Sequence, residues 1–288
     1  MTRSPADLLR LRRTRHVIYL LVAAVVVLPY LFQLSMPFKP SSWAEKLYHR
    51  VDSLKSGSHV LLSFDYDPAS SAELNPMAQA LLRHCFAKGL VPIVMTHWVT
   101  GVSQVEKLLR DTAEEVQKQT GKPVESGKDY VFLGFKPGTS NLVLNMGENL
   151  KAAFDKDFYK QPTESMPALT GVQSLKNIDM AVDLAAGTPG VEMWIVYGSD
   201  RFHFPLGAGT TAVQAPQLYP FIKSNQLVGL LGGLRGAADY EQLLKKPADA
   251  TRGMLAQSWT HTLLVILIIG ANLRLLAGLF RRKRTRDA

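Results

Sequence analysis

The chain has 288 residues, a mass of 31.8 kDa and a formal net charge of +9. The first 16 residues carry five Arg and one Asp, the last 15 carry six Lys or Arg and one Asp, and the stretch between them holds 22 basic and 22 acidic residues. Because the basic surplus lies in the two tails, the charge excludes a nucleic-acid-binding surface on the central part of the chain. The single Cys85 excludes an internal disulfide.

Two apolar segments are typical of transmembrane helices. Val17–Phe32 contains no charged residue, and with its neighbours up to residue 36 it reaches the roughly 20 residues needed to cross a bilayer. The second segment, 259–280, contains Asn272 and also Arg274, whose long side chain can reach the lipid headgroups. No small-x-small cleavage site follows the first segment, so we expect an uncleaved anchor rather than a signal peptide.

The basic tails predict the orientation of the two expected transmembrane helices, 17–36 and 259–280. Positively charged flanks are retained in the cytoplasm, so the tails 1–16 and 281–288 are expected there. The expected location is the plasma (inner) membrane, crossed twice, with the main domain periplasmic or extracellular. The remaining segments are expected to be a membrane-proximal linker and helix at 37–58 and a second linker at 248–258.

Residues 59–247 alternate between short apolar runs and helical patterns. Continuous apolar strands that alternate with helices are typical of a parallel sheet covered on both faces. We therefore expect one α/β domain, doubly wound, with a mostly parallel sheet of about six strands and helices on both faces. The expected strands are 59–65, 90–96, 129–135, 178–185, 202–208 and 226–231, and the expected helices are 76–88, 103–120, 140–154, 189–197, 216–224 and 237–245.

Local signals predict where several helices begin and end. Asn75 before Pro76 favours a cap followed by proline at the first helical position. Ser42, followed three residues later by Glu, has the spacing of a capping box and predicts a short helix within 41–54. Gly89 and Gly121 are expected to end their helices.

Candidate ligand-binding residues lie where the expected strands end, because ligands of open parallel sheets bind beyond those ends. The glycine-rich loops 187–190 and 207–211 precede helices, and their backbone N–H groups could receive a carboxylate or phosphate. Such loops also serve as turns and caps without a ligand, and both interpretations stay open. GAGTTA at 207–212 fits a dinucleotide pattern but lacks the later acidic residue, so we interpret it as a turn. The candidates are Asp65, Asp67, Thr96, His97, Lys136, Thr188, Gly190, Gly209, Thr210 and Arg235.

Asp65 and Asp67 stand one residue apart at the end of the first expected strand. With Thr96, Lys136 and Asp183 they follow the order found in the haloacid-dehalogenase-like phosphatases, which this chain distantly resembles. The resemblance implies a magnesium-dependent phosphatase in which Asp65 is the nucleophile and Asp67 the general acid.

The chain departs from that pattern at several positions. Asp67 is followed by Pro68, Ala69 stands where the family usually has Thr, and Asp183 lies inside a strand without the paired acidic loop that completes the magnesium site. No Ser or Cys nucleophile arrangement accompanies His97. A structural interpretation is that the two acids of the D-x-D orient the turn by accepting backbone N–H bonds.

The expected cytoplasmic parts, about 16 and 8 residues long, are too short for a folded effector, since domains need roughly 50 residues. We therefore expect a binding or accessory subunit of a membrane assembly, with an anchored phosphatase-like hydrolase as the alternative. Expected partners are the membrane and another membrane protein or a second copy, contacted through the transmembrane helices; nucleic acid is not expected. The sequence assigns no catalytic residue, cofactor or set of metal ligands.

Overall fold

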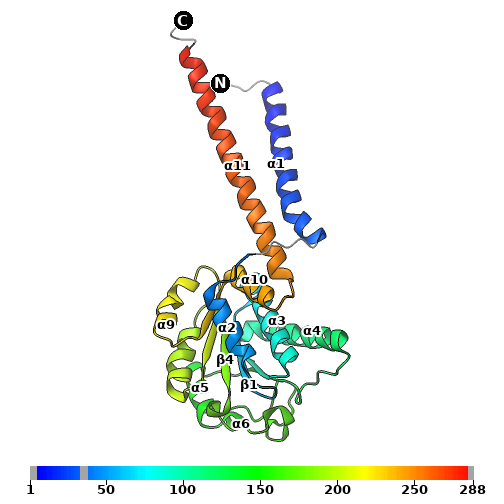
Figure 1. Ribbon diagram of the computed structural model, residues 1–288, viewed down its shortest axis with the longest axis vertical. Coiled ribbons are helices and arrows are strands. Elements are labelled where there is room, and N and C mark those ends of the chain that lie inside the picture. Colours follow the sequence, from blue (N-terminus) through cyan, green and yellow to red (C-terminus); the bar gives the residue numbers. More distant parts are fainter. Residues whose placement is uncertain (1–4, 33–37, 285–288) are drawn as a thin grey trace. The chain divides into compact units, whose positions relative to one another are not determined.

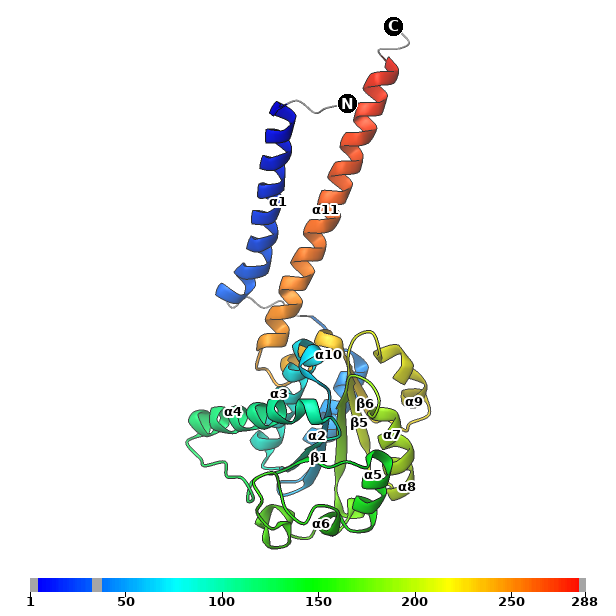
Figure 2. The ribbon, with the colours of Figure 1, turned by 180° about the vertical axis from the view of Figure 1, so that it is seen from behind.

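The structure is a computed structural model that describes residues 5–32 and 38–284, with side chains described for 12–32 and 38–276. Figures 1 and 2 show it from opposite sides. The chain divides into two compact units, one made of Met1–Met36 and Arg252–Ala288 and the other of Pro37–Thr251.

The first unit contains the long helix α1 (Pro5–Leu31) and, from Arg252 onward, the long helix α11 (Asp249–Arg284), whose first three residues belong to the second unit. Their spans Arg12–Leu31 and Asp249–Leu276 are long and apolar enough to cross a membrane. Large apolar side chains on both spans are exposed, as lipid-facing side chains are. The expected linker at 248–258 is corrected by the structure, because α11 begins at Asp249 and continues without a break.

The second unit is built on one six-stranded sheet with strand order β3-β2-β1-β4-β5-β6, and every pairing is parallel. The expected α/β fold is confirmed. The chain runs outward from β1 to β3 and then returns to add β4 beside β1, so β1 and β4 flank the switch point of a doubly wound sheet. The strands are β1 (His59–Asp65), β2 (Val91–Thr96), β3 (Val131–Phe135), β4 (Met180–Ala185), β5 (Leu206–Thr210) and β6 (Gly229–Gly232).

Helices cover both faces of the sheet, and Figure 2 shows the strands between the two layers. One layer contains α2 (Ser42–Asp52), α3 (Ser71–Lys88), α4 (Val102–Thr120) and α10 (Gly233–Leu243). The other contains α5 (Thr139–Glu148), α6 (Leu150–Ala153), α7 (Val191–Met193), α8 (Asp200–Phe202) and α9 (Tyr219–Lys223). Because side chains alternate along a strand, Leu61, Ser63 and Asp65 face the second layer, while Leu62 and Phe64 face the first.

The helix ends agree in part with the local signals. Gly89 and Gly121 end α3 and α4 in the left-handed conformation, with φ of +65° and +67°. The expected starts are wrong: α3 begins at Ser71, five residues before Pro76, and the cap of α2 is Ser41, whose hydroxyl accepts from the Ala44 N–H. Asn75 instead accepts hydrogen bonds from the side chains of Tyr66 and Gln104.

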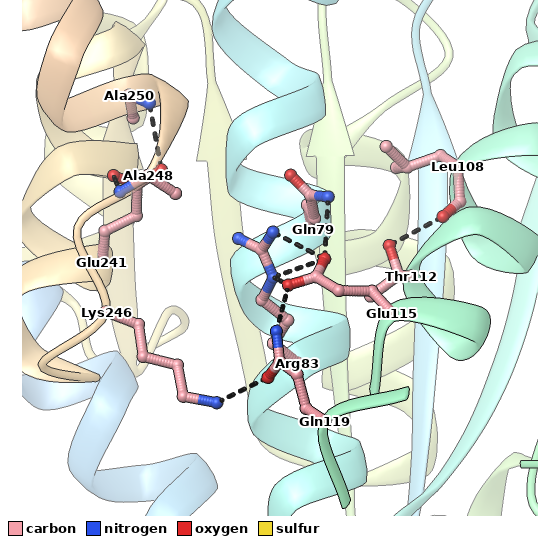
Figure 3. Close-up of polar contacts among 10 residues, drawn as sticks. All are labelled: Gln79, Arg83, Leu108, Thr112, Glu115, Gln119, Glu241, Lys246, Ala248 and Ala250. Atoms are coloured by element: carbon pink, nitrogen blue, oxygen red, sulfur yellow. Dashed lines mark hydrogen bonds and ion pairs between the residues drawn. The ribbon is translucent and has the colours of Figure 1, made fainter. Parts of the chain in front are cut away.

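A polar network joins α3 to α4 (Figure 3). The guanidinium of Arg83 on α3 donates to both carboxylate oxygens of Glu115 on α4, at 2.7 to 3.1 Å. Gln79 and Gln119 also donate to Glu115, and Lys246 donates to Gln119. This network pairs the polar groups along the outer side of the layer.

Glu241 of α10 forms hydrogen bonds with the first turn of α11 (Figure 3). Its buried carboxylate accepts the backbone N–H groups of Ala248, Ala250 and Thr251 and the Thr251 hydroxyl, at 2.7 to 3.0 Å. The N–H groups of a first helical turn lack partners within their own helix, and a negative charge there is favourable. Glu241 therefore caps the N-terminus of α11 although it belongs to another helix.

Candidate functional site

Asp65 ends the central strand β1 and lies fully buried at the centre of a polar cluster. One carboxylate oxygen accepts the His97 backbone N–H at 2.6 Å. The other accepts from the Ser63 hydroxyl at 2.8 Å, lies 3.1 Å from His97 Nδ1, and accepts from Trp194 Nε1 at 3.4 Å. Both oxygens thus receive hydrogen bonds, which hold the carboxylate in place.

Thr96 is the last residue of β2, His97 follows it, and both are buried. The Thr96 hydroxyl accepts the Trp98 N–H at 3.0 Å and so shapes the turn after the strand. The His97 ring contacts Asp65 through Nδ1 and lies edge-on to the Trp194 ring, with 5.6 Å between centroids. Its Nε2 has no hydrogen-bond partner among the described residues.

Asp183 lies in the middle of β4, beside Ser63 of β1 in the register of the sheet. Its side chain is fully buried, and neither carboxylate oxygen receives a hydrogen bond from any described residue. Burial, and next the negative charge of Asp65, raise the pKa of Asp183 well above its usual value.

Asp67 and Lys136 point away from Asp65. Asp67 accepts the Ala69 N–H at 3.1 Å and caps the short 3-10 turn that follows β1. Lys136 donates to the Ala153 carbonyl and lies over the Phe154 ring. The described residues contain no group of three or more His, Cys, Asp or Glu side chains that could hold a metal ion. The geometry therefore does not fit the magnesium site that the phosphatase resemblance implies.

A cavity of about 320 Å³ lies at the carboxyl ends of β4 and β5. We call it the carboxyl-edge cavity. Three sequence candidates, Thr188, Gly190 and Thr210, line it. The complete lining is Ala185, Gly187, Thr188, Gly190, Val191, Glu192, Met193, Val196, Tyr197, Thr210, Gln214, Gln217 and Leu218.

The loop after β4 requires glycine at its last position. A Cβ on Gly190 would lie 2.4 Å from the Gly187 carbonyl oxygen and 2.6 Å from the Ala185 Cβ, distances that real side chains do not adopt. This close approach lets the chain turn from β4 directly into the helix of residues 191–202. Gly190 therefore shapes one wall of the cavity.

The 191–202 helix contains a π-helical segment, Trp194–Ser199. Such segments are rare and are frequent at functional sites. Trp194 and Ile195 point into the core, whereas Val196 and Tyr197 line the cavity with 57% and 40% of their surface exposed. This one segment therefore joins the buried Asp65 cluster to the cavity wall.

The loops after β2, β4 and β5 are tied together by side-chain to backbone hydrogen bonds. Trp98 donates from its indole N–H to the Pro189 carbonyl at 2.9 Å, and the Gln214 amide donates to the Ala186 carbonyl at 2.9 Å. Two further apolar side chains on these loops are exposed, Val99 at 64% and Val213 at 85%. The carboxyl edge thus combines a cavity with exposed apolar side chains on fixed loops.

Two sequence candidates lie elsewhere. Gly209 is inside β5 rather than in a loop, and a Cβ there would meet Leu184 and Met77 on the α3 side of the sheet. Arg235 is on α10, where it pairs with Asp239 at 2.7 Å and lies 4.2 Å from the Phe38 ring centroid. Both positions are explained by packing.

The strand-end pattern in the sequence does not identify the polar side chains that helices contribute to the cavity. Glu192 and Tyr197 come from the 191–202 helix, and Gln217 comes from the 3-10 turn Ala215–Leu218. None of these side chains, nor that of Thr188, has a hydrogen-bond partner among the described residues. The one feature of the sequence that indicates these residues is their position shortly after β4 and β5.

No protein-family model and no curated protein matches this chain. Among solved structures, it is similar to the N-terminal domain of trehalose-6-phosphate phosphatase from Candida albicans, with 10% identity, a TM-score of 0.31, and 80% of this chain and 46% of that chain covered. It is also similar to a trehalose-6-phosphate synthase, with 8% identity, a TM-score of 0.25, and 84% and 49% covered. The chain spans about half the length of each, and likenesses at this level assign no function.

Proposed function

We propose that this chain is a two-pass membrane protein that presents its α/β domain outside the cytoplasm as a binding subunit of a membrane assembly, and that the carboxyl-edge cavity is its binding site. The main support for this proposal is the cavity itself, which lies beside the switch point where ligands of doubly wound sheets bind. Its wall includes the π-helical segment with exposed Val196 and Tyr197.

The cavity lining favours binding over chemistry. It contains no Ser, Cys, His, Lys or Arg, and Glu192 is its one carboxylate. The hydroxyl groups of the lining, at Thr188, Tyr197 and Thr210, make no hydrogen bond to Glu192, so the lining shows no nucleophile paired with a base, the usual arrangement for covalent catalysis. Without a basic side chain, an anion lacks a counter-charge there, so the ligand is an uncharged or cationic group that offers hydrogen bonds and an apolar surface.

A photo-crosslinking experiment tests the site. The full-length protein carries p-benzoylphenylalanine at Tyr197 in one variant and at Lys118 in a matched control, because Lys118 is exposed on α4 away from the cavity. We expect one defined adduct from position 197 that position 118 does not give and that Gln217→Ala weakens. Equal adducts from both positions, or none from position 197, would contradict the proposed site.

The proposed orientation rests on the basic tails around a neutral middle. Cysteine labelling tests it in the native background, because Cys85 is fully buried and burial raises the pKa of its thiol to about 12. Ser56→Cys and Ser165→Cys place thiols at exposed positions. A membrane-impermeant maleimide should label both in intact cells. Labelling only after lysis would place the domain in the cytoplasm.

The anchored phosphatase remains the alternative, favoured by one observation: Asp65 ends the central strand, where the resemblance expects a nucleophile. Its burial among four donors weighs against it, as does the lack of a group of metal-binding side chains in the part of the chain that the structure describes. Magnesium-dependent release of phosphate from a generic ester by the purified protein, lost in Asp65→Asn, would favour the alternative over the binding role.

A further inference from the structure

The buried acids Asp65 and Asp183 differ sharply in their hydrogen bonding. They lie on the neighbouring central strands, where Asp183 is level with Ser63 and Asp65 is level with Ala185. The side chains of Ser63, Asp65 and Asp183 share one face of the sheet. Two carboxyl groups are therefore enclosed together at the centre of the sheet, and the proposed binding role explains neither.

Every donor of the cluster is directed to Asp65. The Ser63 hydroxyl, the His97 backbone and ring, and the Trp194 indole all contact its carboxylate. Ala208, the neighbour of Asp183 on β5, has no polar side chain to offer. Asp183 is therefore fully buried without a donor among the described residues.

An ionised carboxylate in this position would be doubly unfavourable, because it would be desolvated without a donor and would face the charge of Asp65. A protonated carboxyl needs the opposite partner, an acceptor, and the Asp65 carboxylate is one. We infer that Asp183 is a neutral carboxylic acid that donates its proton to ionised Asp65, so that the two buried acids share one proton and one negative charge. The raised pKa of Asp183, caused first by burial and then by Asp65, agrees with this assignment.

The shared proton makes the stability of the domain depend on pH. In the unfolded chain Asp183 returns to its ordinary pKa of 3.8, whereas the folded chain keeps the proton to higher pH. Between the unfolded and the folded pKa of Asp183, the folded state holds more protons than the unfolded state, so the free energy of unfolding falls as pH rises. The contribution of Asp183 is complete below the unfolded pKa and is lost as pH rises through the folded pKa.

The titratable groups that face Asp183 within the described cluster are Asp65 of β1 and His97 at the end of β2. The π-helical segment contributes Trp194 and Ile195, and β5 contributes Ala208, none of which titrates. His97 contacts Asp65 through Nδ1, so a charge on its ring would act on the same carboxylate. The inference does not depend on what occupies the carboxyl-edge cavity.

Thermal unfolding of the full-length protein in mild detergent, from pH 5 to pH 8, tests the inference. Asp183→Asn keeps a donor toward Asp65 and cannot ionise, so its Tm at pH 8 should exceed that of the native protein by about 5 °C, with a smaller difference at pH 5. Asp65→Asn should lower Tm at both pH values, because four donors lose a charged acceptor. Asp67→Asn is the control outside the pair and should change Tm equally at pH 5 and pH 8.

Infrared spectroscopy supplies a second readout that does not depend on stability. The native protein at pH 7 should show the carbonyl stretch of a protonated buried carboxyl, and Asp183→Asn should remove it. A lower Tm for Asp183→Asn across the whole pH range would overturn the inference. If that variant does not fold, the native spectrum decides alone, and absence of the protonated band would also overturn it.

Discussion

The layer of α3, α4 and α10 and the carboxyl edge of β4 and β5 both carry polar side chains but use them differently. In the helical layer, Glu115 and Glu241 each accept several hydrogen bonds. At the cavity, Thr188, Glu192 and Gln217 bond to no described residue. Paired groups hold elements together, whereas unpaired groups on a concave surface are free to meet a ligand. The comparison therefore separates residues that maintain the fold from residues that serve the site.

The largest effect should follow from Glu241→Gln. The substitution keeps the shape of the side chain but replaces one acceptor with an amide that faces the donors of the α11 first turn. Leaving buried donors without acceptors should lower the free energy of unfolding by about 2 to 4 kcal/mol, measured by chemical denaturation in detergent. Loss below about 0.5 kcal/mol would mean that water or another group replaces the carboxylate.

A smaller effect is expected from Gly190→Ala, at the boundary between the two regions. The new methyl group would collide with the Gly187 carbonyl and the Ala185 side chain, so the loop after β4 must shift. We expect a loss of about 1 to 3 kcal/mol in the free energy of unfolding and weaker crosslinking from position 197. Gly171→Ala is the control for a destabilising glycine substitution outside the cavity lining: its Cβ would meet nothing within 4 Å, but φ of +82° makes alanine strained there, so it should lower stability and leave crosslinking from position 197 unchanged. Crosslinking that survives in Gly190→Ala would show that the loop does not shape the site.

The sheet could be predicted because its strands are continuous apolar runs, but β5 shows the limit of that signal. Strand 202–208 was expected, and the structure has Leu206–Thr210. Phe202 and Phe204 are buried as strand residues would be, yet they belong to a helix end and a loop. His203 adopts φ of +63°, which ends the helix before Pro205. Buried aromatic residues alone do not distinguish these cases.

The predicted helix start at Asn75 and Pro76 is wrong for a related reason. A cap followed by proline is a local preference, whereas α3 gains more from burying residues on both sides of Pro76. Leu74 before the proline and Met77 after it are both fully buried. Packing along the sheet therefore carries the helix through the proline.

The D-x-D pair was the hardest feature to interpret from the sequence. Two residues with one residue between them on a strand share a face, but β1 ends at Asp65, so the alternation stops before Asp67. Asp65 is buried and Asp67 caps the next turn. The cavity was predictable only in position: strand ends predicted Thr188, Gly190 and Thr210, while Tyr197 and Gln217 depend on how helices pack against the sheet.

The smallest effect on stability should follow from changing Glu192→Gln and Gln217→Ala together. Glu192→Gln repeats the chemical change made at Glu241, but here the carboxylate is exposed and accepts no hydrogen bond from a described residue. The free energy of unfolding should therefore stay within about 0.5 kcal/mol of the native value. Crosslinking from position 197 should nevertheless fall, because both side chains line the cavity. Reduced stability with unchanged crosslinking would contradict this assignment, because Glu192 and Gln217 would then maintain the fold rather than bind the ligand.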